Sequence, residues 1–477
     1  CRRTVKIAVL APDGRLLMVS VDDIRRKPVH GSTLAFNYQV GNDMLADEIN
    51  RKLTETDQGT GCGGLMRLYW QPVALTDELA GNRPVVPVRM FGEDLVLFRD
   101  GNGEIGLIDR HCPHRQVDLC YGRLEENGLR CPFHGWLFAP DGTCLDQPGE
   151  LPENNRVRHF GQANYPCIER NGMIFAYLGP GDPPPLPAVD CLQAPDSHVF
   201  AFKGFLECNY LQAVEVGIDP AHASFLHRYL QDEDTDDSYG RQFRSGTGDD
   251  DIPVTWIMRN FPAPTIDVKR TDFGLQIEAR RHLDDSRDHV RVTNLLFPNA
   301  IVIPMSSSMA ITQWHVPVDD HRCYWYAHFT SYDAPVDKPL MREQRMELYK
   351  LPDYKPRLGK FNNWGYDPAE QESETYTGMG MDINVHDQWA VESPGPITDR
   401  SKEHLAGTDV AISRYRAMLL RTMDIAADPD RHSELPLYRS VDGRSLGPEW
   451  HDSVMTANCP REEWLAGYQE RRDGSGW

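Results

Sequence analysis

Two short segments of the chain each carry one cysteine and one histidine, namely Cys112-Pro113-His114 and Cys131-Pro132-Phe133-His134. Structural zinc sites usually group cysteine with cysteine and histidine with histidine. The alternating order here gives each segment one sulfur and one nitrogen ligand. That arrangement suits a [2Fe-2S] cluster in which two thiolates hold one iron and two imidazoles hold the other. Trp136, just after the second segment, would help to shield such a cluster. We therefore predict an iron–sulfur site, with a zinc site as the alternative.

A second group of metal-binding residue types follows the pattern Glu215-x3-Asp219-x2-His222-x4-His227. The spacing of apolar residues over 208–226 predicts a helix. On that helix Glu215, Asp219 and His222 would line one side, because residues three or four apart share a face. His227 lies more than a turn beyond His222, so the helix is expected to break or loosen between the two imidazoles. Two histidines and a carboxylate form the facial triad of non-haem Fe(II) oxygenases.

The carboxylate of this triad has several candidates. Asp219 is close in sequence, but so short a segment is not expected to supply all three ligands at one face. Asp387, in Val385-His386-Asp387-Gln388-Trp389, is a distant candidate, and Asp382 is the nearest alternative to it. The residue types alone leave this choice open.

The elements that must position the cysteine and histidine pairs are expected to be short strands. From about residue 65 to 178 the pattern of strands and turns predicts a small all-β domain. Asp100-Gly101-Asn102-Gly103 marks one hairpin turn, and Asn171-Gly172 has the residue types of a type I′ turn. The strands are expected at residues 85–90, 95–98, 105–108, 168–170 and 173–178.

A proline-rich stretch, residues 179–187, predicts an interdomain linker, because proline neither continues a helix nor pairs in a central strand. The region after it mixes helix and strand signals. Thr408 is expected to cap a helix that runs to Met423. Strands are expected at residues 254–258, 274–279, 290–296 and 310–315, and a solvated acidic loop at 232–237.

The first 43 residues look unlike the rest of the chain. A hairpin around Pro12-Asp13-Gly14 would pair residues 5–10 with 16–21, and a helix is expected at residues 45–53. We hypothesise that Met44 is the natural start. Sequence upstream of Met44 in the natively expressed protein, detected by mass spectrometry, would contradict this hypothesis.

Length and composition narrow the class of protein. A chain of 477 residues is expected to form at least two domains. Its net charge of −21 argues against a nucleic-acid partner. No apolar run approaches the roughly 20 residues of a membrane span, and no signal peptide is recognisable, so we expect a cytoplasmic protein without a membrane partner. The 11 cysteines, an odd number, favour metal binding over a disulfide framework.

Together the two motifs resemble those of the Rieske non-haem iron oxygenase family. The resemblance is to oxygenase large subunits of the phthalate 4,5-dioxygenase type, a group that includes aryl O-demethylases. It runs from about Leu65 to Leu420 and is supported by Leu68-Tyr69-Trp70-Gln71-Pro72, Asn209-Tyr210-Leu211-Gln212 and Gly395-Pro396-Ile397-Thr398-Asp399-Arg400. It implies an α+β fold, with an all-β Rieske [2Fe-2S] domain before a helix-grip catalytic domain, an antiparallel sheet around a long helix. We expect an N-terminal extension at 1–43, the Rieske domain at 44–180, the catalytic domain at 181–455 and a C-terminal tail at 456–477.

The resemblance also implies a role for each candidate residue. Thiolates would hold one cluster iron and imidazoles the other, through Cys112, Cys131, His114 and His134. The mononuclear Fe(II) would be bound by His222, His227 and Asp387. Asp219 resembles a bridging residue that hydrogen-bonds an iron-bound histidine and a cluster histidine of the neighbouring subunit, here His134. Glu215 occupies a supporting acidic position.

By the same resemblance, a separate reductase with NAD(P)H, flavin and a ferredoxin-type centre supplies electrons. O2 and a small aromatic substrate then react at the iron site of a head-to-tail homotrimer. Dihydroxylation, monooxygenation and O-demethylation are all compatible with the motifs. Relatives favour aromatic carboxylates, so an arginine is expected in the pocket, with Arg259, Arg270, Arg280 and Arg281 as candidates. The alternatives are a Rieske electron-transfer protein and a zinc-stabilised binding module, which metal analysis would separate from an oxygenase.

Overall fold

A computed structural model describes residues 6–10, 16–20, 47–231, 252–306, 308–437 and 447–477. The chain divides into two units, Cys1–Asn42 and Asp43–Trp477, and each is described by itself. In the first, β1 (Lys6–Leu10) pairs antiparallel with β2 (Leu16–Ser20), as the sequence predicted. The expected turn around Pro12-Asp13-Gly14 and the acidic loop at 232–237 lie outside the described residues.

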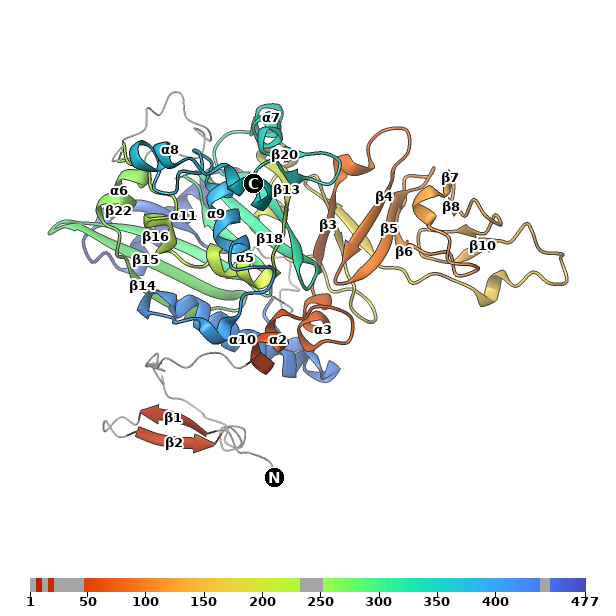
Figure 1. Cartoon of the computed structure of the whole chain (residues 1–477), viewed down its shortest axis with the longest axis horizontal. Coiled ribbons are helices and arrows are strands. Elements are labelled where there is room, and N and C mark those ends of the chain that lie inside the picture. Colours follow the sequence, from red (N-terminus) through yellow and green to blue (C-terminus); the bar gives the residue numbers. More distant parts are fainter. Residues whose placement is uncertain (1–5, 11–15, 21–46, 232–251, 307, 438–446) are drawn as a thin grey trace. The chain divides into compact units, whose positions relative to one another are not determined.

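The second unit begins with two helices and then the small β region that carries the cysteine and histidine pairs (Figure 1). The helices are α2 (Asp47–Thr54) and α3 (Gly61–Arg67). One three-stranded sheet contains β4 (Val85–Met90), β5 (Glu93–Arg99) and β6 (Ile105–Asp109). A four-stranded sheet has the order β10-β9-β8-β7, with bounds Cys144–Asp146, Leu137–Phe138, Gly128–Arg130 and Arg123–Glu125. A small core of its own, including Val96, Phe98, Leu129 and Phe138, holds this region together.

A third small sheet joins this β region to the rest of the unit. It has the order β11 (Cys167–Arg170), β12 (Met173–Ala176) and β3 (Gln71–Leu75). The turn between β11 and β12 has Asn171 at φ 50° and Gly172 at φ 77°, the conformation that a type I′ turn requires. The sequence prediction of this hairpin is therefore confirmed.

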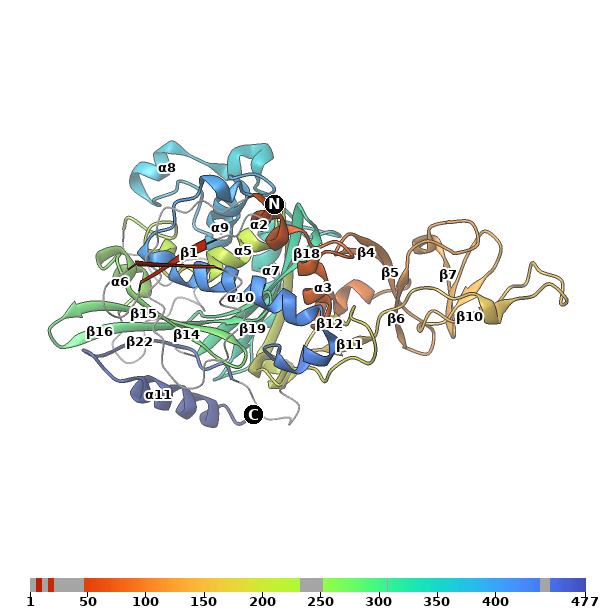
Figure 2. The ribbon, with the colours of Figure 1, turned by 90° about the horizontal axis from the view of Figure 1, so that it is seen from below.

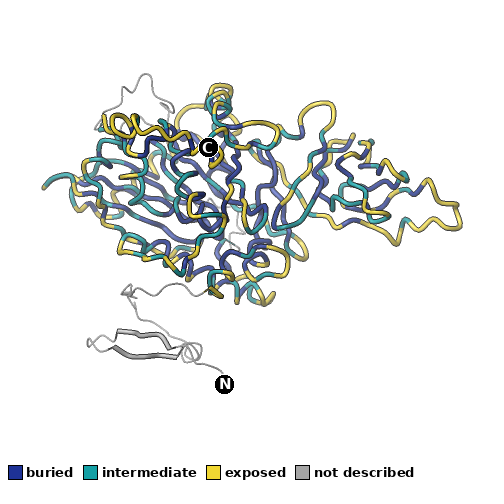
Figure 3. The backbone as a smooth tube through the Cα atoms, in the orientation of Figure 1, coloured by how far each residue is buried: buried dark blue, intermediate teal, exposed yellow. Residues whose placement is uncertain are grey.

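Residues after the proline-rich stretch build a large antiparallel sheet. Its main order is β13-β19-β18-β17-β16-β15-β14, and β22 pairs with β16. Bounds in that order are Val199–Leu206, Arg322–Ser331, Met309–Asp319, Ala300–Pro304, Arg287–Leu296, Gly274–Asp284, Thr265–Arg270 and His451–Thr456. The apolar interior lies mainly on this sheet, whose strands are the most continuously buried part of the trace (Figure 3).

Helices cover both faces of the large sheet. Figure 2 shows α5 (Tyr210–Gly217), α9 (Ile383–Glu392) and α10 (Val410–Ala426) on one side and α11 (Arg461–Gly474) on the other. Helix α4 (Asp190–Gln193) precedes α5 in the sequence. Between α5 and α9 lie α7 (Lys338–Leu348), the short hairpin β20–β21 (Tyr349–Lys350 and Lys355–Pro356) and α8 (Pro368–Ser373). Antiparallel sheets with separate helices confirm the predicted α+β class. Within the described residues, no helix is long and apolar enough to cross a membrane.

Three local predictions were wrong. Residues 254–258 form part of α6 (Val254–Asn260) rather than a strand, because burial of Ile257 and Met258 on one helical side outweighs β-favouring side chains. The predicted helix over 208–226 is shorter: α5 ends at Gly217, before Asp219 and His222. Helix α10 begins at Val410, and Thr408 lies in a preceding 3₁₀ turn instead of capping it.

Candidate metal centres and their surroundings

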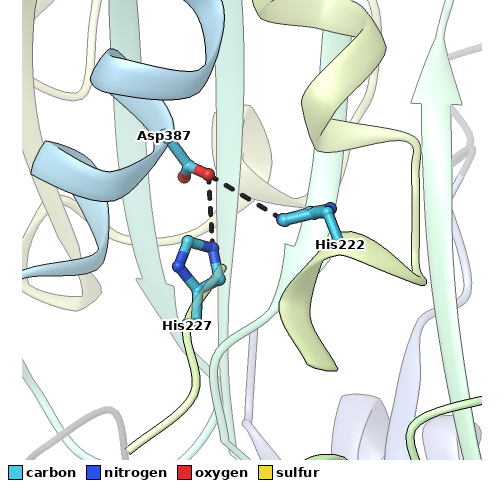
Figure 4. A group of neighbouring side chains, drawn as sticks. All are labelled: His222, His227 and Asp387. Atoms are coloured by element: carbon cyan, nitrogen blue, oxygen red, sulfur yellow. Dashed lines mark ion pairs between the residues drawn. The ribbon is translucent and has the colours of Figure 1, made fainter. Parts of the chain in front are cut away.

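Three side chains from two distant segments converge in the second part of the chain (Figure 4). His222 lies in a 3₁₀ turn, His222–Ser224, His227 follows it in a loop, and Asp387 comes from α9. The Asp387 Oδ1 atom is 3.2 Å from His227 Nε2 and 3.8 Å from His222 Nε2. One ligand atom from each residue lies within 4.8 Å of the others. Spacing of this kind suits a single metal ion, as a facial triad requires.

The chemistry of Asp387 fits a cation at this point. Its Oδ1 atom is buried and accepts no hydrogen bond, although a buried carboxylate oxygen normally has a partner. Burial alone would raise the pKa of Asp387, but the His227 and His222 imidazoles outweigh it and hold that pKa below its usual value. The carboxylate is therefore ionised and ready to bind a metal.

The end of α5 places His222. Because the helix stops at Gly217, Asp219 and His222 do not share a helical face with Glu215, contrary to the sequence prediction. Asp219 Oδ1 instead accepts the Ala221 backbone N–H at 2.8 Å and shapes the turn. The His222 Nδ1–H donates to the backbone carbonyl of Asp219, which leaves His222 Nε2 toward Asp387. A histidine whose second nitrogen is held in this way presents a fixed lone pair to a metal.

His386 performs the corresponding task for His227. Its Nε2 atom is 2.8 Å from the Gly380 carbonyl, which can only accept, so Nε2 carries the proton. The bare Nδ1 atom of His386 lies 3.4 Å from His227 Nδ1, and the two rings stack at 5.6 Å. His227 thus donates from Nδ1 and keeps its Nε2 lone pair on the side of Asp387. The sequence shows a histidine directly before Asp387 but gave no sign of this contact.

The other acidic candidates take different places. The Asp219 Oδ2 atom is 3.9 Å from His222 Nδ1, so this side chain lies beside the triad. Asp382 caps α9 by accepting the Asn384 backbone N–H at 2.8 Å, and it faces Arg345 at 3.4 Å. Asp387, and not the alternative Asp382, therefore lies with His222 and His227.

Glu215 is buried between two arginines that sequence reasoning did not find. Its carboxylate oxygens are 2.9 Å from Arg400 Nη2 and 2.5 Å from Arg416 Nε. Burial would raise the pKa of Glu215, but the two guanidinium groups outweigh it and keep that pKa below its usual value. Glu215 therefore ties α5 to α10 and to the turn that holds Arg400, and it acts by positioning. Arg400 ends the family-like stretch 395–400, but the sequence assigned no role to it or to Arg416.

A largely apolar cavity of about 210 Å³ opens beside the triad. His227 and Asp387 are among its lining residues. None of the four arginines expected from the sequence lines it; Arg291 and Arg345 do. Arg281, for example, is turned away toward Ser224 Oγ at 3.0 Å and two backbone carbonyls. Strand direction decides which side chain faces inward, and the sequence alone did not settle it.

The two cysteine and histidine segments also come together. Cys112 and His114 follow β6, and Cys131 and His134 lie between β8 and β9. The His114 and His134 ring centroids are 4.4 Å apart, and both Nδ1 atoms are buried without a hydrogen-bond partner. Trp136 stacks on His114 at 4.8 Å.

The sulfur atoms of this site fit a cluster as well. The Cys112 thiol contacts that of Cys131, and burial raises the pKa of Cys112 to about 11. A buried thiol of this kind becomes a thiolate when a metal binds it. Two sulfurs and two orphaned imidazole nitrogens at neighbouring loop tips suit the ligand set of a Rieske cluster.

Comparison with known proteins identifies both regions. Residues 69–165 match the model of the Rieske [2Fe-2S] domain, and residues 176–432 match the "LigXa C-terminal domain like" model. The 3-chlorobenzoate-3,4-dioxygenase oxygenase subunit of Comamonas testosteroni is 32% identical over 80% of this chain and 89% of that protein. The phthalate 4,5-dioxygenase oxygenase subunit of Pseudomonas putida is 31% identical over 79% and 86%. The 5,5'-dehydrodivanillate O-demethylase oxygenase subunit of Sphingobium sp. is 29% identical over 89% and 91%.

Solved structures agree on the fold. Dicamba monooxygenase bound to dicamba is 18% identical, with a TM-score of 0.53 over 76% of this chain and 98% of that chain. NdmA of Pseudomonas putida CBB5 with caffeine has a TM-score of 0.53 over 84% and 100%, at 16% identity.

The domain match over 176–432 lies beyond the cluster region, so neither an electron-transfer Rieske protein nor a zinc module accounts for the chain. A Rieske [2Fe-2S] cluster and a mononuclear iron are the cofactors of these enzymes and of this protein. The chain belongs to the Rieske non-haem iron oxygenases, as the oxygenase component of an aromatic dioxygenase or monooxygenase.

Proposed function

We propose that His222, His227 and Asp387 bind the mononuclear Fe(II), beside a cavity that holds an aromatic substrate. The observation that carries this proposal is the convergence of three ligand atoms within 4.8 Å at the cavity wall. The [2Fe-2S] cluster is held by the thiolates of Cys112 and Cys131 and the imidazoles of His114 and His134. The cluster region spans 44–180 and the catalytic region 181–455, with an extension at 1–43 and a tail at 456–477.

The residues around the triad have different roles in the reaction. Iron, when bound, supplies the redox chemistry that makes O2 reactive. Apolar cavity walls, including Ile303 and Phe329, keep water away and hold the substrate next to the triad. The backbone carbonyl of Asp219 accepts the Nδ1–H of His222. Across a subunit boundary, the Asp219 carboxylate accepts the Nε2–H of His134, whose Nδ1 would bind the cluster. The side chain of Asp219 is 19% exposed, so a neighbouring chain can reach it.

We also propose a head-to-tail homotrimer. Figures 1 and 2 show β7–β10, beside the cluster loops, at one end of the second unit and well away from α5 and α9, which lie nearer its middle. A cluster therefore serves the iron site of a neighbouring chain better than its own. Both regions expose apolar side chains that such a ring would cover. These are Tyr121, Phe133, Leu151 and Phe160 in the cluster region, and Phe225, Leu230, Tyr376 and Met381 in the catalytic region.

Electrons come from a separate NAD(P)H-dependent reductase with flavin and a ferredoxin-type centre, and the assembly works in the cytoplasm. The relatives named above include two dioxygenases and an O-demethylase, so hydroxylation and O-demethylation are both candidate reactions. O2 uptake coupled to substrate loss, measured with a surrogate reductase, would distinguish the reaction type through the products.

Metal analysis tests the iron assignment. The purified protein should contain about three irons per chain, two in the cluster and one mononuclear. The Asp387→Ala variant should keep the cluster absorbance and lose the mononuclear iron alone. Glu392→Gln, on the same helix but bonded to Trp364 and Gln388, is the matched control and should keep all the iron. Zinc in place of iron, or unchanged iron in Asp387→Ala, would overturn the proposal.

A further inference from the structure

One wall of the cavity carries an imidazole that no protein group satisfies. His315 lies on β18, lines the cavity and is 5% exposed. Neither Nδ1 nor Nε2 of His315 has a hydrogen-bond partner. Ile311 and Gln313 line the same cavity, because alternate residues of a strand point to one face. Buried polar atoms are nearly always paired, so an unpaired imidazole aimed into a cavity indicates a missing hydrogen-bonding ligand.

The cationic side chains of the cavity, in contrast, already face carboxylates. Arg291 Nη1 contacts Asp452, and Arg291 Nη2 donates to the Pro304 carbonyl at 2.7 Å. Asp452 is buried and also accepts from His289 Nε2 at 2.7 Å, so it depends on both partners. Arg345 Nη2 lies 3.4 Å from Asp382. Among the described lining residues, each guanidinium is therefore balanced by its own acid.

This balance decides which ligand charge the cavity accepts. A carboxylate placed among apolar walls would need a cation of its own, since an unpaired buried charge is costly. Drawing Arg291 toward such a ligand would leave Asp452 buried with less compensation. A neutral ligand meets no such conflict and can use the free nitrogens of His315. Burial lowers the pKa of His315 to about 4, so its ring is neutral at physiological pH and can both donate and accept.

The cavity volume is sufficient for an aromatic ligand. An apolar cavity of about 150 Å³ accommodates benzene. The cavity here is about 210 Å³, which leaves room for an aromatic ring with its substituents. Trp325 and Phe329 provide flat apolar surface for that ring.

We propose that this oxygenase takes an uncharged aromatic whose hydroxyl, ether or carbonyl oxygen hydrogen-bonds to His315. This inference rests on the proposed function and replaces the carboxylated substrate that the resemblance suggested. His315 is the residue that selects for the oxygen, and Asp452 is the positioning residue that cancels the charge of Arg291. Asp452 lies beyond residues 176–432, the range that matches the family model.

Binding of three matched probes to the iron-loaded enzyme without O2 tests the proposal by calorimetry. The probes are 3-methylphenol, m-xylene and 3-methylbenzoate, which differ in one substituent. We expect 3-methylphenol to bind about 10-fold more tightly than either of the others, since it alone satisfies His315 without adding charge. Equal or tighter binding of 3-methylbenzoate would overturn the proposal.

Variants assign the effect to individual residues. His315→Phe should abolish the preference for 3-methylphenol over m-xylene, and Asp452→Asn should tighten 3-methylbenzoate binding by about 10-fold. His328→Phe is the matched control, because His328 is buried on neighbouring β19 against Trp314 and Phe175 and does not line the cavity. A preference that survives in His315→Phe would refute the role of His315. Cluster absorbance reports folding of every variant.

Iron content and substrate-dependent O2 uptake, measured on the same preparations, keep the two proposals apart. Normal iron with no probe preference would refute the substrate class alone. Missing mononuclear iron would refute the iron assignment first.

Discussion

At the scale of single residues, proton positions on histidines decide whether a metal can bind. His222 and His227 each donate from Nδ1, one to a backbone carbonyl and the other to the bare nitrogen of His386. Both Nε2 lone pairs are thereby free to bind a metal ion that Asp387 Oδ1 also contacts. Partners of this kind typically change metal affinity by about 10–100-fold when they are removed.

His386→Phe should therefore weaken iron binding at the mononuclear site by about 10-fold, because His227 loses its acceptor. His386→Gln, whose amide oxygen can accept the same proton, should restore most of the affinity. The measurement is Fe(II) titration of the apo site, followed with cluster absorbance as a control for folding. Equal affinity in the wild-type and His386→Phe proteins would contradict the assigned tautomers.

Asp219→Asn should keep both metals but lower turnover on the order of 100-fold. The asparagine oxygen can still accept from Ala221 and preserve the turn, but the neutral amide removes the negative charge beside His222 and the charged acceptor for His134. Steady-state O2 uptake and iron analysis together check this expectation. Asp367→Asn, at the N-cap of α8, is a control in which a comparable cap is altered. Normal coupled oxygenation in Asp219→Asn would rule out the bridging role.

At the scale of elements, buried ion pairs hold the helices that present the ligands. Glu215 on α5 contacts Arg416 on α10 and Arg400 in a 3₁₀ turn, and Arg416 also contacts Glu403 at 2.7 Å. These contacts hold the last turn of α5, which directly precedes Asp219 and His222. Losing one member leaves buried charges without compensation.

Glu215→Ala should lower the free energy of unfolding by about 3 kcal/mol, because two arginines lose their buried partner. Urea denaturation followed by circular dichroism measures the change. Glu434→Ala breaks a solvent-exposed pair with Arg431 and should leave stability unchanged. A loss in Glu215→Ala no larger than that of Glu434→Ala would show that this buried network is dispensable.

At the scale of the whole molecule, the large sheet buries histidines in neutral form. Burial lowers the pKa of His328 to about 3, and burial together with the Arg471 charge lowers that of His451 to about 3. In the unfolded chain both would titrate near 6.5. Between these values the unfolded state binds more protons, so the stability present above pH 6.5 is lost as the pH falls.

The free energy of unfolding should accordingly fall as the pH decreases from about 7 to 5, by up to about 1.4 kcal/mol per pH unit for each histidine. The melting temperature should fall with it. His328→Phe should flatten this dependence, since it removes one of the titrating groups. Thermal unfolding at a series of pH values compares the two proteins. Parallel pH profiles would mean that His328 does not contribute.

Much of the chain could be predicted from local patterns. The spacing of Cys112, His114, Cys131 and His134 identified the family, and turn residues such as Asn171-Gly172 located a hairpin. Patterns of this kind are local, because a turn or a ligand pair depends on neighbours in sequence. Where local preference competed with burial, as at residues 254–258, the prediction failed.

The sequence by itself therefore determined the family, the α+β class and the residue types available to bind two iron centres. Only the tertiary structure decided that Asp387, rather than Asp382, meets the two histidines, and that Arg291 enters the cavity already neutralised by Asp452. These contacts join segments far apart in the chain. They depend on strand register, on where a helix ends and on which face is buried, and no local spacing carries that information.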